Sequence, residues 1–130
     1  MKIKYILILS LFLISSLLFS ANTMKLEILD ESTEKFGKEM VEELKMLFDS
    51  EKDFILVSDT KASRLILKVQ TSKTDKGFSY AVILIAPGQQ GLNYYIGSMV
   101  DFVKNKKVQA GVEDIFSYTV EQTKALRGVK

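Results

Sequence analysis

The 130-residue sequence contains neither cysteine nor histidine, and it has a single proline. Without cysteine the chain can form no disulfide bond and has no thiolate nucleophile. Without histidine it also lacks the commonest general base and, together with cysteine, the commonest transition-metal ligands. These absences favour a noncatalytic protein, and we expect no catalytic residue, no bound cofactor and no metal site.

Charge is also absent from a long stretch near the start, between Lys4 and Lys25. Residues 6–19 within this stretch are almost wholly apolar, with lysines before them and small residues after them. This order is typical of a secretory signal peptide, which we place at residues 1–21. The alternative is an uncleaved membrane anchor, because the whole uncharged span is long enough to cross a bilayer. We therefore expect a periplasmic or extracellular protein, or alternatively a membrane-anchored one that faces away from the cytoplasm.

Removal of residues 1–21 makes the chain electrically neutral. The leader holds two of the 18 basic residues and none of the 16 acidic ones, which leaves 16 of each sign. Nucleic-acid binding needs a basic field, so a nucleic-acid partner is not expected. The remainder, residues 22–130, has the length of one domain and contains no repeat or proline-rich linker.

Apolar spacing along residues 22–130 alternates between the periods of strands and helices. Residues 54–57 form a short apolar run after the first helical segment, as expected of a buried strand parallel to the first one. The pattern predicts an α+β fold in the order β-α-β-β-β-β-α: a mixed sheet of four to five strands packed by two amphipathic helices, one on each face. The expected strands are residues 24–28, 54–57, 63–70, 78–86 and 92–103, and the expected helices are residues 33–50 and 109–126.

Two polar segments invite a functional interpretation. The segment PGQQGLNYYIG, residues 87–97, is rich in glycine but joins two strand patterns, whereas a phosphate-binding loop leads from a strand into a helix. We interpret it as a hairpin connection. Asp49, Glu51, Asp53 and Asp59 could serve a glycosidase or a calcium site. We attribute this cluster to the turn chemistry of a polar connection.

The segment LKMLFDSEKDFILVSDTKASRLILKV, residues 44–69, has a helix that ends in Leu44 to Phe48, a Phe-x-x-Val strand and a strand that begins at Ala62. With the order of elements over residues 24–126, it resembles the amino-terminal domain of TolB and the CsgG-like envelope assembly proteins. The resemblance implies a noncatalytic domain that docks onto other proteins of the cell envelope. We expect an exported noncatalytic binding or envelope-assembly module; the alternative is a small secreted hydrolase or enzyme inhibitor.

The run AVILIA, residues 81–86, is apolar on both faces of its strand. Such a run usually marks a central strand covered on both sides, and we favour that arrangement, with one helix on each face. If both helices share one face, an open apolar surface results and would bind a partner. Its residues would be Ile66, Ile83, Ile85, Tyr95 and Met99. The expected partner is another envelope protein, with membrane contact only through an uncleaved leader.

Overall fold

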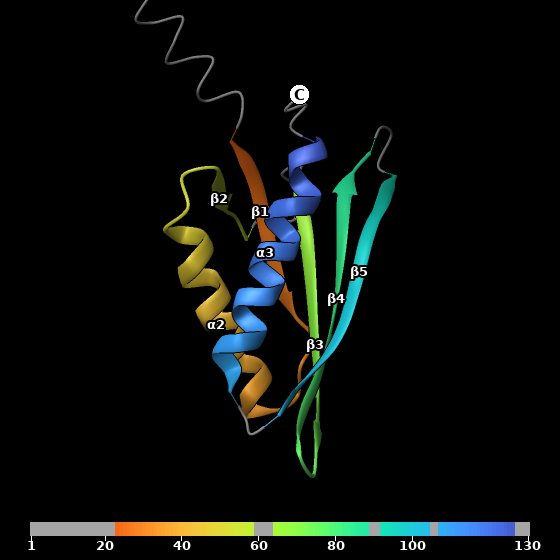
Figure 1. The fold of residues 1–130 in the computed structure, drawn as a ribbon. Coiled ribbons are helices and arrows are strands. Elements are labelled where there is room, and N and C mark those ends of the chain that lie inside the picture. The colour runs from red at the N-terminus through yellow and green to blue at the C-terminus, as the bar shows by residue number, and fades with distance from the viewer. Residues whose placement is uncertain (1–22, 59–63, 89–91, 105–106, 127–130) are drawn as a thin grey trace, which may run out of the picture.

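The computed structural model describes residues 23–58, 64–88, 92–104 and 107–126. They form five strands and two helices (Figure 1). In chain order these are β1 (Met24–Asp30), α2 (Lys35–Asp49), β2 (Phe54–Leu56), β3 (Leu65–Thr74), β4 (Gly77–Pro87), β5 (Asn93–Lys104) and α3 (Val108–Leu126). The predicted α+β class and order of elements are confirmed.

The five strands form one mixed sheet in the spatial order β2-β1-β3-β4-β5. β1 pairs in parallel with both β2 and β3, so the prediction of a strand at residues 54–57 parallel to the first is confirmed. The β3-β4 and β4-β5 pairs are antiparallel. β2, with three residues, and β5, with twelve, are therefore the two edges of the sheet.

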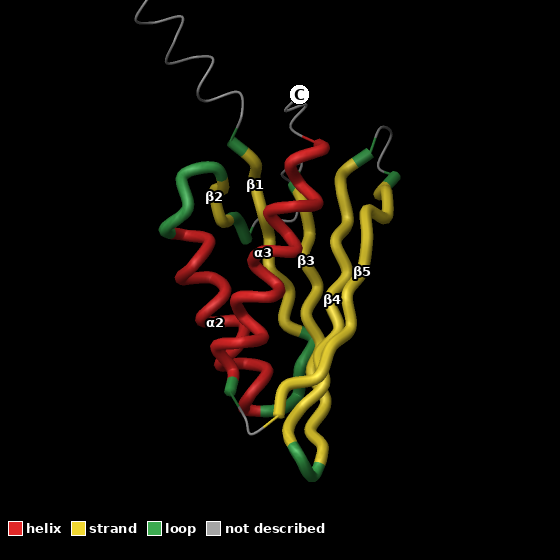
Figure 2. Tube along the Cα trace, in the orientation of Figure 1, coloured by secondary structure: helices red, strands yellow, loops and turns green. Residues whose placement is uncertain are grey.

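Both helices lie on the same face of this sheet and contact each other (Figures 1 and 2). The prediction of one helix on each face is therefore wrong. The physical reason is that the apolar stripes of the helices meet: the Phe48 ring of α2 lies 4.9 Å from the Phe116 ring of α3. The stripes also pack on one set of strand residues, so a single core on one side of the sheet buries both helices.

The core side of the sheet, which we call the inner face, is clearest along β4. Phe78, Tyr80, Val82, Leu84 and Ala86 alternate along this strand and are all buried. Helix α3 approaches them closely at Gly111, where an added Cβ would lie 2.6 Å from Met40 Cε and 3.3 Å from Tyr80 Cε1. Glycine thus lets the two helices and β4 approach closely at this point, where a larger residue would displace the end of the Met40 side chain.

Candidate functional site

The opposite face of the sheet, which we call the outer face, carries neither of the two described helices (Figure 1). Along β4 the outer face carries the residues that alternate with the buried ones. Among them, Ile83 is 41% exposed. The pairing register places Ile83 between Lys68 of β3 and Ser98 of β5, and Ile85 between Ile66 and Tyr95. The apolar side chains gathered there, which we call the outer patch, are Ile66, Ile83, Ile85, Tyr95, Val100 and Phe102.

The exposure of Ile83 shows that the favoured arrangement of a strand covered on both sides is wrong. The helices leave one face of β4 open, so the alternating side chains of AVILIA have different environments. The structure brings four of the five predicted surface residues onto the outer face: Ile66, Ile83, Ile85 and Tyr95.

The fifth predicted residue, Met99, lies on the inner face. It pairs with the buried Val82 of β4 and packs against the core. The cause is a β-bulge between Leu84 and Ile85, where the pairing shifts from Gly97 to Tyr95 on β5. Because of the extra residue, side chains after the bulge point to the opposite face from the one that simple alternation along β5 predicts. Tyr95 and Met99 therefore point to opposite faces although they are four residues apart.

The same bulge places two apolar residues of β5 on the outer face that sequence reasoning missed. Val100 lies opposite Ala81 and is 75% exposed, and Phe102 lies opposite Ser79 and is 39% exposed. The available signal was the alternation of Val100 and Phe102 along a strand-like segment. Simple alternation along β5 places Val100 and Phe102 on the opposite face from Tyr95. They share its face only because a bulge lies between Tyr95 and Val100.

A small hollow opens on the outer face above Ala81. Its volume is about 170 Å³, and its outer-face lining consists of Gln70, Ser72, Ser79, Ala81 and Val100. Alanine leaves this space because its neighbours on both adjacent strands have longer side chains. The hollow could hold one apolar side chain with hydroxyl and amide groups around it.

The other half of the outer face, over β1, is more polar. Glu27 of β1 is buried and forms an ion pair with Arg64 that precedes β3; the two side chains are 9% and 14% exposed. Lys68 and Glu31 form a second, more exposed ion pair at 3.5 Å. The outer patch thus lies on β3, β4 and β5, and on β2 the exposed Ile55 is separated from it by the polar side chains over β1.

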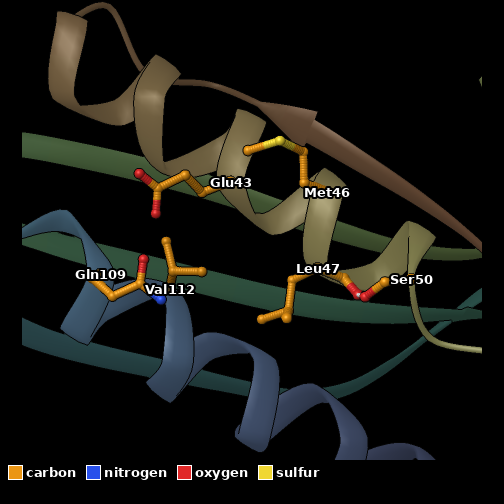
Figure 3. A pocket seen from close by; sticks show the side chains of 6 residues that line it. All are labelled: Glu43, Met46, Leu47, Ser50, Gln109 and Val112. Atoms are coloured by element: carbon orange, nitrogen blue, oxygen red, sulfur yellow. Dashed lines mark hydrogen bonds between the residues drawn. The ribbon is translucent and has the colours of Figure 1, made fainter.

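Two further hollows lie away from the outer patch. One, of about 340 Å³, lies between α2 and α3, with Glu43 and Gln109 at one end and Ser50 at the other (Figure 3). The second, of about 390 Å³, borders β1 and β2; Glu27, whose carboxylate pairs with Arg64, and Lys45 are its charged residues. Among the described residues, Glu43 is the one ionisable residue that lines the first hollow, and in the second the Glu27 carboxylate already pairs with Arg64.

Tyr80 is the most strongly perturbed titratable group among the described residues. Burial raises its pKa, and the nearby carboxylates of Asp114 and Asp101 raise it further. The hydroxyl donates a long hydrogen bond of 3.4 Å to Asp114 Oδ2. The phenol therefore stays protonated at neutral pH and has a packing role.

The acidic residues singled out in the sequence lie at the connection from α2 to β2, except Asp59, which is outside the described residues. There the carbonyl oxygens of Glu51 and Asp53 accept backbone hydrogen bonds from Phe54 and Met24. Within the described ranges no group of three or more acidic side chains is arranged to hold a metal ion. The structure thus gives this cluster the geometry of a chain connection.

Two other sequence predictions concern segments that the structure describes only in part or not at all. Residues 1–21, predicted to be a signal peptide or an anchor, lie outside the described residues. For the helices that are described, none combines the length and hydropathy needed to span a bilayer. At the predicted hairpin, Gly88 N–H donates to Leu92 O at 2.7 Å and joins the antiparallel strands β4 and β5. The residues between them, 89–91, are not described.

These features define a small α+β domain in which both described helices cover the same face of a mixed sheet. Among solved structures, TolB from Acinetobacter baumannii has a similar fold: the TM-score is 0.60 at 10% sequence identity, over 77% of this chain. The match spans only 28% of the TolB chain. The predicted resemblance to part of TolB is confirmed for the fold, and the comparisons give no support to a CsgG-like relationship.

Other comparisons add little. The hypothetical protein CT253 from Chlamydia trachomatis aligns with 65% of this chain and 72% of its own, at 9% identity and a TM-score of 0.48, a likeness too low to support any argument. No protein-family model matches the chain, and no curated protein matches it in sequence.

Proposed function

We propose that this protein is an exported, noncatalytic binding module of the cell envelope, and that its outer patch binds another envelope protein. The fold it shares with part of TolB and the apolar leader in the sequence support this proposal. The observation that carries it is the outer patch: six apolar side chains on the face that the described helices leave uncovered.

An uncovered apolar surface of this kind has a physical cost. Apolar surface that leaves water contributes about 25 cal/mol per Å², and the large side chains of the outer patch do not gain this energy in the free protein. Soluble proteins rarely keep such contiguous patches unless they bind a partner. Ile83, Tyr95 and Val100, exposed by 41%, 65% and 75%, are the residues with the most to gain from a partner.

The surroundings of the outer patch indicate what such a partner presents. The hollow above Ala81 suits one apolar side chain, and the serines and glutamine around it offer hydrogen bonds at its rim. Hydrophobic centres with polar rims are typical of protein interfaces. The partner surface that fits best is an apolar protrusion surrounded by polar groups.

The test compares partner capture by the wild type and by two lysine variants. Ile83→Lys places a charge in the centre of the outer patch, whereas Ile55→Lys places the same charge on the outer face of β2, at the opposite edge of the sheet. Quantitative cross-linking and pull-down from envelope fractions should show loss of the partner with Ile83→Lys and retention with Ile55→Lys. Circular dichroism of both variants checks that they are folded. Equal capture by a folded Ile83→Lys variant would contradict the proposal.

Export is tested separately, at the amino terminus. We expect a mature chain that begins near Ala21 or Asn22, because small residues end the apolar run there. Amino-terminal sequencing of protein from the extracytoplasmic fraction would show this cleavage. An intact Met1 in membranes that resists alkaline washing would establish the anchored alternative, and recovery from the cytoplasm alone would contradict export.

A further inference from the structure

The long edge strand β5 has a free side. It pairs only with β4, and none of the described elements lies beyond it (Figures 1 and 2). The opposite edge, β2, has three residues, whereas β5 has twelve. An exposed edge strand of this length presents a row of backbone donors and acceptors to which another strand can pair.

One hydrogen bond identifies the residues that face this free edge. Phe102 N–H donates to the side-chain Oδ1 of Asp101 at 2.7 Å, so this N–H is not directed at β4. The backbone groups of an antiparallel strand point to alternate sides with a period of two residues. Ser98 and Val100, on the same side of the bulge as Phe102, therefore also direct their backbone groups to the free edge.

Little protects this edge from pairing. Natural edge strands are often blocked by proline, by lysines in the strand or by a covering element. The strand has no proline, and its two charged residues are Asp101 and the terminal Lys104. The Asp101 carboxylate occupies a single N–H, that of Phe102, and the neighbouring Val100 is 75% exposed.

We propose that a second copy of this chain pairs antiparallel along β5, about a two-fold axis at Val100. Directly opposed residues of an antiparallel pair point to the same face of the sheet, whereas successive residues along one strand point to opposite faces. The two-fold axis must therefore lie at a single residue, which then opposes its own copy, and not midway between two successive residues. An axis at Asp101 would oppose two carboxylates, which is destabilising. An axis at Val100 opposes two valines and places Phe102 opposite Ser98 of the second copy, where the Phe102 N–H exchanges its bond to the Asp101 carboxylate for one to the Ser98 carbonyl.

Charge also favours a second copy as the occupant. Residues 22–130 carry 16 basic and 16 acidic residues, so two copies do not repel each other through net charge. In the proposed register Asp101 lies opposite Met99 of the second copy, and no like charges are opposed. The pairing extends the sheet and leaves Ile66, Ile83 and Ile85 of both outer patches open, whereas Val100 and Phe102 belong to both surfaces.

The chain's lack of cysteine permits a direct test of the axis. Directly opposed residues of an antiparallel pair have Cα atoms about 4.5–5.5 Å apart, within the range of a disulfide bond. The full-length protein with Val100→Cys should therefore form a disulfide-linked dimer at least about tenfold faster than the Ile55→Cys control, because pairing raises the effective concentration of the thiols. Non-reducing electrophoresis at low micromolar protein measures both rates. Equal rates would overturn the proposal.

A second measurement uses charge at the same position. Val100→Lys and Val100→Glu each oppose like charges across the axis, so each should raise the dimer dissociation constant about tenfold in sedimentation equilibrium. An equimolar mixture of the two should restore the dimer, and Ile55→Lys should leave it unchanged. A wild-type protein that is monomeric throughout the micromolar range would overturn the proposal, as would a dimer that resists both substitutions.

Discussion

Leu84 and Ile83 are neighbours on β4, both are large aliphatic residues, and their environments are opposite. Leu84 is fully buried under the helices, whereas Ile83 is 41% exposed on the outer face. The difference shows that apolar composition on both sides of a strand does not establish that both sides are covered. Coverage depends on where the helices pack, and here both pack on the inner face.

Among substitutions that compare the two faces of β4, Leu84→Lys is expected to lower the free energy of unfolding the most. This change places an unpaired ammonium among fully buried side chains, and we expect it to destabilise the protein by about 3 kcal/mol or more. Urea unfolding monitored by circular dichroism measures the free energy of unfolding. A Leu84→Lys variant with wild-type stability would show that the inner face is open in solution.

The two ion pairs of the outer face extend the comparison to charged residues. Glu27→Ala removes a buried carboxylate that pairs with the Arg64 guanidinium, and we expect a loss of more than about 1 kcal/mol. Glu31→Ala breaks the exposed pair with Lys68 and should change stability by less than about 0.5 kcal/mol. Thermal melts of the two variants check the difference, and equal melting temperatures would show that the half of the outer face over β1 is as solvated as the rest.

The local structure of the chain was predictable because local patterns determine it. The helix expected at residues 109–126 is observed at Val108–Leu126, and the strand expected at residues 78–86 is observed at Gly77–Pro87. The parallel pairing of β1 with β2 follows from the helix between them, since parallel strands need a crossover. These features depend on spacing within a few residues.

The face covered by the helices was not predictable in the same way, because it depends on contacts between residues far apart in the chain. Phe48 and Phe116 meet in space, and nothing in either helical pattern shows that the two stripes pack together. The bulge at Leu84 and Ile85 is a second such feature, and it moved Met99 off the predicted surface. One inserted residue changes the face of every side chain beyond it.

Gly97 tests the inner face at the bulge. An added Cβ would collide with the Tyr118 hydroxyl of α3, so we expect Gly97→Ala to destabilise the protein by about 1 kcal/mol. Tyr118→Phe removes the hydroxyl, and the nearest ring atom, Cζ, would then lie 3.5 Å from the new methyl, an ordinary contact. The double variant should therefore be more stable than Gly97→Ala alone. Equal destabilisation in both backgrounds would mean that α3 does not pack over this part of β5.

A much smaller effect than that of Leu84→Lys is expected on the outer face, from Ile83→Lys. The side chain of residue 83 already contacts water, so the ammonium stays hydrated, and the main penalty is repulsion from Lys68 directly opposite on β3. We expect a loss of less than about 1 kcal/mol, well below that of Leu84→Lys, and Ile83→Thr, which adds no charge, should lose less still. Urea unfolding of the three variants under identical conditions gives the ranking. If Ile83→Lys unfolds as readily as Leu84→Lys, the outer face is buried in the protein as it exists in solution, and the contrast between the two faces of β4 would have to be abandoned.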